Sequence, residues 1–251
     1  MLQPHRSRYW LNANPKDPVA FGQQVKAVCA CYRAAPRLLE EERVHTVSTD
    51  EMTGIQALER IAPTRPMRPG QTECREFEYK RRGTQCLIGN FEVATGRVLS
   101  PTVQQTRTEQ DFADHLARTV ATDPKAGWIF VADNLTIHCA ESLVRYVAKA
   151  CGLTEDLGRK GKRGILKSVA TRKAFLTDKG HRLRFVYVPK HTSWLNQIEI
   201  WFSILVRRVL RRGNFPSVSD LREKILAFID YFNRTMAKPF KWTYTGRPLN
   251  V

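Results

Sequence analysis

Three acidic residues occupy positions from which carboxylates could carry out metal-dependent chemistry. The sequence predicts a strand leading into Asp50, a short buried strand ending just before Asp133, and a helix that carries Glu199. In open α/β sheets, ligands bind in the crevice beyond the carboxyl ends of the strands. Carboxylate oxygens suit Mg²⁺, and two such ions can activate a water and stabilise the leaving oxygen of a phosphodiester. Taken singly, each acid is better explained as a cap or turn residue, so position alone does not decide.

The elements that must position these acids follow from hydrophobic periodicity and turn residues. β-Branched and apolar runs predict strands at 43–49, 75–81, 84–93, 97–103, 128–132 and 183–188, with Gly83 as the turn between the second and the third. Apolar residues at helical spacing predict helices at 18–34, 108–122, 140–150, 194–212 and 217–233. Pro36 is expected to end the first helix, and Thr108 to cap the second.

This order of elements predicts an α/β fold. A mixed five-stranded sheet flanked by helices satisfies it, as in the ribonuclease H-like arrangement. We expect residues 1–40 to form an N-terminal helical segment or linker, and residues 41–251 to form the ribonuclease H-like domain. Residues 152–182 are basic, punctuated by glycine and weakly periodic, which predicts a basic insertion or flexible arm before the last strand. Three prolines within residues 63–72 predict an extended surface loop.

The net charge is the unusual feature of the composition. The formal charge is +17, and residues 141–251 hold 23 Lys and Arg against 8 Asp and Glu. So lopsided a charge predicts a polyanionic partner, with nucleic acid as the first candidate. The alternative is a soluble protein that is merely basic. The sequence contains no apolar stretch of membrane-spanning length and no evident signal peptide, so we expect the six cysteines to be reduced.

Two basic clusters are candidates for contacts with phosphates. The first is the loop cluster Arg159, Lys160, Lys162 and Arg163, and the second is the helix cluster Arg207, Arg208, Arg211 and Arg212. On an α-helix, residues four apart share a face, so the helix cluster predicts a ridge that follows a DNA backbone. The alternative is that these arginines complement the helix dipole, for which four are more than is needed.

The sequence around the three acids carries more information than their spacing. The strings VSTDEMTGIQALER (47–60), FVADNLTIH (130–138) and VPKHTSWLNQIEIWFSIL (188–205) resemble the three catalytic blocks of DDE-superfamily transposases. Within that superfamily they are similar to the bacterial insertion-sequence branch related to mariner elements. Residues 8–25 and 231–249 also resemble that branch, so the resemblance covers most of the chain.

This resemblance implies a function for residues 41–251. It identifies Asp50, Asp133 and Glu199 as the metal-binding catalytic triad of a DDE domain with two Mg²⁺ ions, for which Mn²⁺ can substitute. The implied activity is hydrolysis of phosphodiesters at transposon ends, followed by joining of the 3′-hydroxyl ends to target DNA. It also implies a homodimer on DNA and a location in the bacterial cytoplasm.

Several polar neighbours of the triad are candidates for a second shell. Asn134 and His138 follow the second acid, while His191 and Asn196 precede the third. Each could orient substrate or a metal-bound water, although a lone histidine is more often a satisfied structural residue. Glu51 should point to the opposite face from Asp50 if the strand continues.

The sequence departs from the family in ways that leave alternatives open. About 40 residues precede the first catalytic strand, too few for a helix-turn-helix module, which leaves two alternatives: a truncated DNA-recognition region or one that is encoded separately. Thr136 stands where a second asparagine is expected, and Asp133 and Glu199 are 66 positions apart because of the basic segment. Two alternatives to a transposase core are another ribonuclease H-like nuclease and a non-catalytic DNA-binding remnant of a mobile element.

Overall fold

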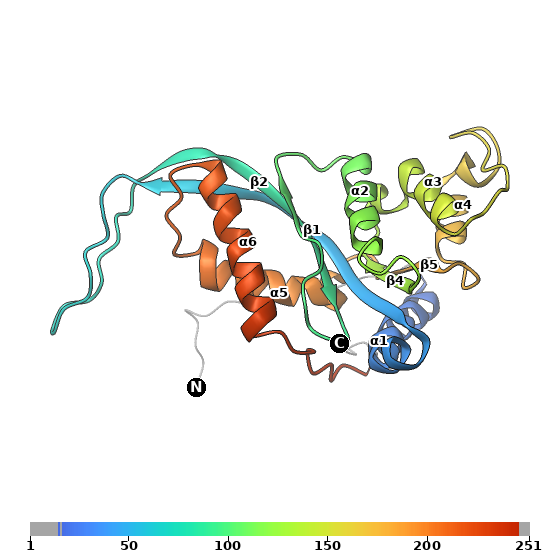
Figure 1. Cartoon of the computed structure of the whole chain (residues 1–251), viewed down its shortest axis with the longest axis horizontal. Coiled ribbons are helices and arrows are strands. Elements are labelled where there is room, and N and C mark those ends of the chain that lie inside the picture. The colour runs from blue at the N-terminus through green and yellow to red at the C-terminus, as the bar shows by residue number, and fades with distance from the viewer. Residues whose placement is uncertain (1–14, 16, 246–251) are drawn as a thin grey trace.

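A five-stranded mixed sheet forms the centre of the protein, and the computed structural model describes residues 15 and 17–245 (Figure 1). The strands are β1 (Val44–Arg60), β2 (Tyr79–Glu92), β3 (Thr102–Gln104), β4 (Gly127–Ala132) and β5 (Leu183–Tyr187). Their order is β3-β2-β1-β4-β5, with the first three antiparallel and β1, β4 and β5 parallel. This is the predicted ribonuclease H-like arrangement.

Helices cover both faces of the sheet. They are α1 (Pro18–Glu42), α2 (Glu109–Val120), α3 (Glu141–Ala150), α4 (Val169–Leu176), α5 (Gln197–Leu205) and α6 (Val218–Thr235). Alternation along β4 separates the two layers: Phe130 packs in a core with α2, α3 and α4, whereas Val131 packs with α1. On β2, Leu87 packs with α5 and α6 on the α1 side of the sheet. Every described helix is too short or too polar to traverse a lipid bilayer.

The first helix is longer than its sequence predicts. It continues through Pro36 and ends at Glu42, where Arg43 adopts a left-handed conformation. Proline removes one backbone donor but does not end this helix, because Val28, Tyr32 and neighbouring apolar residues bury one face against the sheet. The division predicted at residue 40 therefore falls inside α1, a packed element. Residues 8–14, 16 and 246–249 of the flanking resemblance lie outside the described residues.

The predicted turn at Gly83 is also wrong. Gly83 lies inside β2, which runs without interruption from Tyr79 and replaces the two strands predicted there. Beyond the body of the sheet, β1 and β2 continue as a two-stranded ribbon whose tip, residues 61–78, projects away from the helices (Figure 1). The predicted loop at 63–72 lies at this tip and is exposed, with short bridges between Arg65 and Cys74 and between Arg68 and Gln71.

Residues 152–182 do precede the last strand, but they are not simply a flexible arm. A 3₁₀ turn at Ile165–Lys167 and the helix α4 lie within them. Ser168 and Thr171 form a capping box at the start of α4. Leu166, Phe175 and Leu176 are buried in the same core as α2 and α3. The few apolar residues in this segment therefore fix it to the core, which its weak periodicity does not indicate.

The predicted helix at 194–212 is divided into three parts. Ser193–Leu195 forms a 3₁₀ turn, α5 follows, and Val206–Leu210 forms a π-helical turn. In this turn the amide of Arg211 donates to the carbonyl of Val206, five residues earlier. The helix cluster therefore spans a π-helical turn, and its alignment along one face stays a prediction. The other predicted helices and Thr108 as the α2 cap are confirmed, and all six cysteines are free.

His115 on α2 makes the stability of the fold sensitive to acid. It is fully buried, and its Nδ1 lies 2.8 Å from the hydroxyl of Thr102. Burial, together with the nearby charge of Arg118, lowers the pKa of His115 to about 3. The unfolded chain takes up this proton below pH ~6.5 while the folded protein does not, so stability falls as the pH drops from that value towards 3.

We expect the wild type to lose about 2 kcal/mol more than His115→Gln between pH 7 and pH 5, since each pH unit below ~6.5 costs about 1.4 kcal/mol. Denaturant unfolding of both proteins at the two pH values measures this difference. Equal losses in the two proteins would show that His115 does not stay neutral in the fold.

Candidate metal centre

Asp50 lies in the middle of β1. The predicted strand end at residue 49 is wrong, because β1 continues to Arg60. Asp50 is opposite Gly89 of β2, and a Cβ on Gly89 would lie 3.2 Å from the side chains of Ile198 and Phe202. The glycine therefore allows α5 to pack closely on the sheet beside Asp50.

Asn196, a predicted neighbour of the triad, is in contact with Asp50. It is fully buried, and its amide donates to Asp50 Oδ2 at 3.1 Å and to the carbonyl of Thr49 at 3.0 Å. Its Oδ1 accepts from the hydroxyl of Ser48, which itself accepts from the amide of Ile198 at 2.9 Å. These bonds fix the start of α5 on β1 and hold the carboxylate of Asp50 in one orientation.

Asp133 directly follows β4, as predicted, and begins a tight loop. Its Oδ1 accepts from the amide of Leu135 at 2.8 Å and lies 2.7 Å from Nδ1 of His138. The other ring nitrogen of His138 lies 3.0 Å from Oε1 of Glu51. Strand alternation predicts that Glu51 points to the opposite face from Asp50. Carboxylate oxygens of the two residues nevertheless lie within 4.8 Å of each other, and His138 joins Glu51 to Asp133.

The proximity of these acids shifts their ionisation. Burial would lower the pKa of His138, but hydrogen bonds and charges from Asp133 and Glu51 outweigh it and raise the pKa to about 10. Burial also opposes the charged form of Asp133, yet the contact with His138 brings its pKa below the usual range. Burial and the negative charge of Asp133 raise the pKa of Asp50 to about 7. The same two causes raise the pKa of Glu199, in the first turn of α5.

The carboxylates of Asp50 and Glu199 lack a compensating cation. Within residues 17–245, no lysine, arginine or histidine forms an ion pair with either of them. The negative charge of Asp133 disfavours the charged forms of both, so Asp133 repels each of them. A divalent cation bound among them would relieve this repulsion, so the donor set fits a hard metal ion such as Mg²⁺.

A second grouping of possible ligands includes His138. Among the described residues, ligand atoms of Asp50, Glu51 and His138 all lie within 4.8 Å of one another. His138 uses both ring nitrogens on carboxylates and carries a raised pKa, so it has no free lone pair for a metal. Among the described residues, Asp50, Asp133 and Glu199 do not meet this distance limit as a group.

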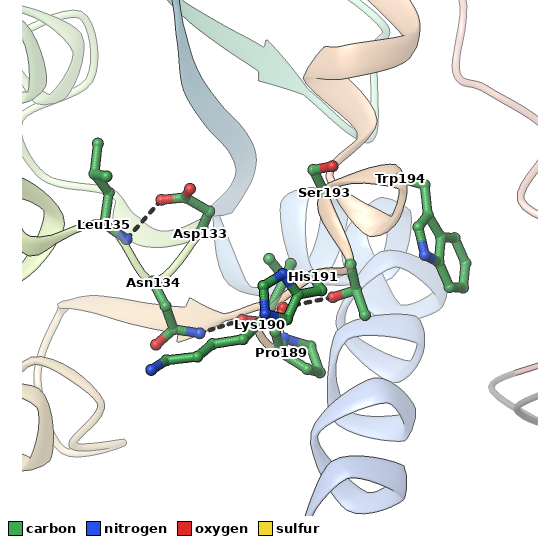
Figure 2. A pocket seen from close by; sticks show the side chains of 10 residues that line it. Asp133, Asn134, Leu135, Pro189, Lys190, His191, Ser193 and Trp194 are labelled. Carbon is green, nitrogen blue, oxygen red and sulfur yellow. Dashed lines mark hydrogen bonds between the residues drawn. The ribbon is translucent and has the colours of Figure 1, made fainter. Parts of the chain in front are cut away.

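A cavity of about 590 Å³ lies beside Asp133 (Figure 2). Its walls come from Asp133–Leu135 and from the segment Val188–Trp194. His191, a predicted neighbour, lines the cavity with a left-handed backbone, φ 62°, and Trp194 is 52% exposed at its edge. Asn134 donates to the carbonyl of Val188, so its amide joins the two walls. The cavity brings predicted residues from the second and third sequence blocks together.

The basic clusters do not lie in this cavity. All eight predicted residues are exposed. In the loop cluster, Arg163 pairs with Asp156, and Lys160 lies 3.7 Å from Glu109. Arg207 and Arg208 line a separate shallow pocket with Met236.

Sequence reasoning missed three residues that hold the site. Ser48 fixes Asn196, Lys173 donates to Oδ1 of Asn134, and the hydroxyl of Tyr187 donates to the carbonyl of His138 at 2.6 Å. A polar residue two before Asp50 on the same strand face could have indicated Ser48. Lys173 and Tyr187 carry no comparable signal in the sequence.

Comparison with known families places these residues in a recognised domain. The family model described as DDE superfamily endonuclease matches residues 45–222, which include all three acids. The chain belongs to this family. A search of curated proteins gives no match. The match covers most of this DDE domain and extends from the start of β1 into α6.

Solved structures similar to the DDE domain include transposases at very low identity. The Mos1 transposase paired-end complex with left transposon end has 11% identity and a TM-score of 0.48, covering 94% of this chain and 61% of that one. The catalytic domain of Mos1 mariner transposase has 10% identity and a TM-score of 0.46, covering 91% and 90%. The present chain thus spans 61% of the length of the chain in the paired-end complex.

Proposed function

We propose that this DDE domain is the catalytic core of a metal-dependent DNA transposase. It would hydrolyse phosphodiesters at transposon ends and join the 3′-hydroxyl ends to target DNA, with Asp50, Asp133 and Glu199 as its metal ligands. The observation that carries the proposal is that Asp50 and Glu199 have no ion-pair partner among the described residues and experience the negative charge of Asp133, which itself lines an open cavity. Family membership and the resemblance of all three sequence blocks to transposases support it.

In this proposal the three acids would bind the metal ions, and neighbouring side chains would orient the acids. A bound pair of Mg²⁺ or Mn²⁺ ions would activate a water or the 3′-hydroxyl of the DNA and stabilise the leaving oxygen. The carboxylate oxygens of Asp50, Asp133 and Glu199 would bind these ions as hard ligands. Asn196 keeps Asp50 oriented through its 3.1 Å hydrogen bond, and His138 does the same for Asp133. The cavity lined by Asn134 and His191 would receive the DNA strand next to the reacting phosphate.

The assay that tests this proposal uses DNA flanking the gene. Duplexes from that DNA, offered with Mg²⁺ or Mn²⁺ and a supercoiled target plasmid, should be nicked at a defined end and joined through their 3′-hydroxyl. Nicking without joining would favour another ribonuclease H-like nuclease. Metal-independent DNA binding without cleavage would indicate a non-catalytic remnant. Inverted repeats in the flanking DNA would also support the bacterial insertion-sequence branch and a cytoplasmic site of action.

DNA is the partner that the charge distribution favours. We propose that both basic clusters contact phosphates, with the helix cluster as the larger contributor because its arginines form no ion pair in the described chain. Neutralising Arg207, Arg208, Arg211 and Arg212 to glutamine should flatten the dependence of log K on log salt by about 0.9 for every phosphate that the variant no longer neutralises. Fluorescence anisotropy with duplex DNA at several salt concentrations measures this slope.

A charge-matched variant provides the control for the helix cluster. Four exposed cations already form ion pairs with acids four residues away: Arg37, Arg145, Lys224 and Arg234. Replacing these four with glutamine removes the same formal charge but should leave the salt slope close to that of the wild type. An unchanged slope in the helix-cluster variant would refute its role.

We also propose that the protein forms a homodimer on DNA and works with a separate helix-turn-helix region. The ribbon supports an assembly, since its tip projects away from the helices (Figure 1) and the apolar residues Ile61, Met67 and Phe77 within residues 61–78 are exposed. Light scattering with and without transposon-end DNA should give two protein chains per complex. A complex with one chain at saturation would contradict the dimer.

A further inference from the structure

The basic segment contacts the loop that carries Asp133. We infer that α4 is a brace for this loop, and that Arg172 and Lys173 are positioning residues for the metal centre. The inference rests on the proposed role of Asp133 as a metal ligand. It assigns a function to a segment whose sequence predicts only an insertion with DNA-binding charges.

Arg172 is the main connection between α4 and the loop. Arg172 is only 7% exposed, and no carboxylate of the described residues forms an ion pair with it. Its Nε donates to the carbonyl of Cys139 at 2.7 Å, and its Nη1 donates to the carbonyl of Leu166 at 3.2 Å. A buried charge is costly unless it is hydrogen-bonded, so these two carbonyls hold the guanidinium in place.

The carbonyl of Cys139 belongs to the end of a short turn. Thr136–Cys139 is a 3₁₀ helix between Asp133 and α3, and such a turn leaves its last carbonyls without partners inside the helix. Arg172 satisfies Cys139, and the hydroxyl of Tyr187 satisfies His138 at 2.6 Å. Side chains outside the loop thus hold the carbonyls of two consecutive loop residues, His138 and Cys139.

Lys173 holds the beginning of the same loop. Its ammonium donates to Oδ1 of Asn134 and lies 5.0 Å from the ring centroid of Tyr187. The amide of Asn134 in turn donates to the carbonyl of Val188, just after β5. The loop is therefore fixed at its first residues by Lys173 and at its last residues by Arg172.

His138 transmits this restraint to the metal centre. Its ring is fully buried, and the two nitrogens lie 2.7 Å from Asp133 Oδ1 and 3.0 Å from Glu51 Oε1. A shift of the His138 backbone would break one of these contacts, because Glu51 belongs to the rigid sheet. Since α4 is anchored by Phe175 and Leu176 in the core, it provides a stationary support for the loop.

The test compares Arg172→Gln with Arg182→Gln. Arg182 is a matched control, since it also donates to two carbonyls, those of Ala126 at 2.6 Å and Ala150 at 3.0 Å. These contacts lie at the start of β4 and β5, whereas the Asp133 loop follows the end of β4. In metal-free protein, hydrogen exchange of amides 135–140 should speed up at least about tenfold in Arg172→Gln only. Calorimetry should show Mn²⁺ binding weakened about 10- to 100-fold, the range typical when a metal ligand is deprived of its hydrogen-bonding partner.

Two further variants keep the test decisive. If Arg172→Gln does not fold, Arg172→Lys should retain part of the metal affinity, and Lys173→Met should weaken binding without affecting the Arg172 contacts. Unchanged exchange and Mn²⁺ affinity in Arg172→Gln, or equal losses in Arg182→Gln, would overturn the brace. Failure of the proposed function would give a different result. The wild type and Asp133→Asn would then bind Mn²⁺ equally, while hydrogen exchange of amides 135–140 would still show whether α4 braces the loop.

Discussion

Asparagine in place of Asp133 is expected to abolish both cleavage and joining of DNA. The variant loses an anionic ligand, while its amide still fills the same volume next to His138. Losing several kcal/mol of charge stabilisation reduces the rate by at least about a thousandfold, since each factor of ten corresponds to about 1.4 kcal/mol. Asp50→Ala and Glu199→Gln should have the same effect. Plasmid nicking and strand-transfer assays with Mg²⁺ measure these losses.

An exposed acid serves as the control for the triad. Among residues 17–245, Asp230 on α6 forms an ion pair only with Arg234 four residues later, and both side chains are largely exposed. Asp230→Asn should cleave and join like the wild type. Calorimetry with Mg²⁺ should give no binding in Asp133→Asn and normal binding in Asp230→Asn. Activity near that of the wild type in Asp50→Ala would refute the assignment of the metal ligands.

Replacing His138 with phenylalanine is expected to produce the largest loss of stability in this region. The side chain of Glu51 is only 1% exposed, and His138 is its cationic partner. Removing one member of a buried pair costs about 3–5 kcal/mol, because the other charge is left without compensation. Denaturant unfolding in the presence of a chelator measures this cost without a contribution from bound metal.

A double variant separates this charge effect from the effect on packing. Phenylalanine at 138 combined with Glu51→Gln should recover about 1–3 kcal/mol, because the uncompensated charge is then absent. A surface pair gives the comparison: Glu141→Gln, which breaks the ion pair with Arg145, should cost about 0.5 kcal/mol or less. Strict additivity of the two changes at Glu51 and His138 would mean that the pair carries no coupling energy.

The sequence was sufficient to predict the layers of the fold, Asp133 directly after β4 and Glu199 on a helix, but it placed Asp50 at a strand end although this residue lies inside β1. Apolar periodicity located α2, α3, α6, β4 and β5, because each of these buries one regular face or both faces. It failed at Pro36 and Gly83, where packing in one case and strand pairing in the other override local preference. It also failed at the π-helical turn, for which residue preferences give no warning.

The contacts around the candidate site depend on tertiary structure. Glu51 was expected to point away from Asp50, and no pattern in the sequence indicates that His138 meets Glu51 from a position 87 residues later. Arg172 and Lys173 fall in a weakly periodic basic segment, where charges are usually solvated. Only the folding of that segment onto the core reveals that Arg172 is buried and that Lys173 binds Asn134.

The irregularity in β1 has a consequence for the site. The pairing of β1 with β2 shifts register between Met52 and Ile55, and Gly54 within it has a φ of 65°. This shift and a second one between Gln56 and Leu58 form a joint between the body of the sheet and the ribbon. Asp50 lies on the body side of the joint, within the continuous part of the ladder. The regular pairing around Asp50 is therefore separated from the ribbon, whose strands pair in a different register.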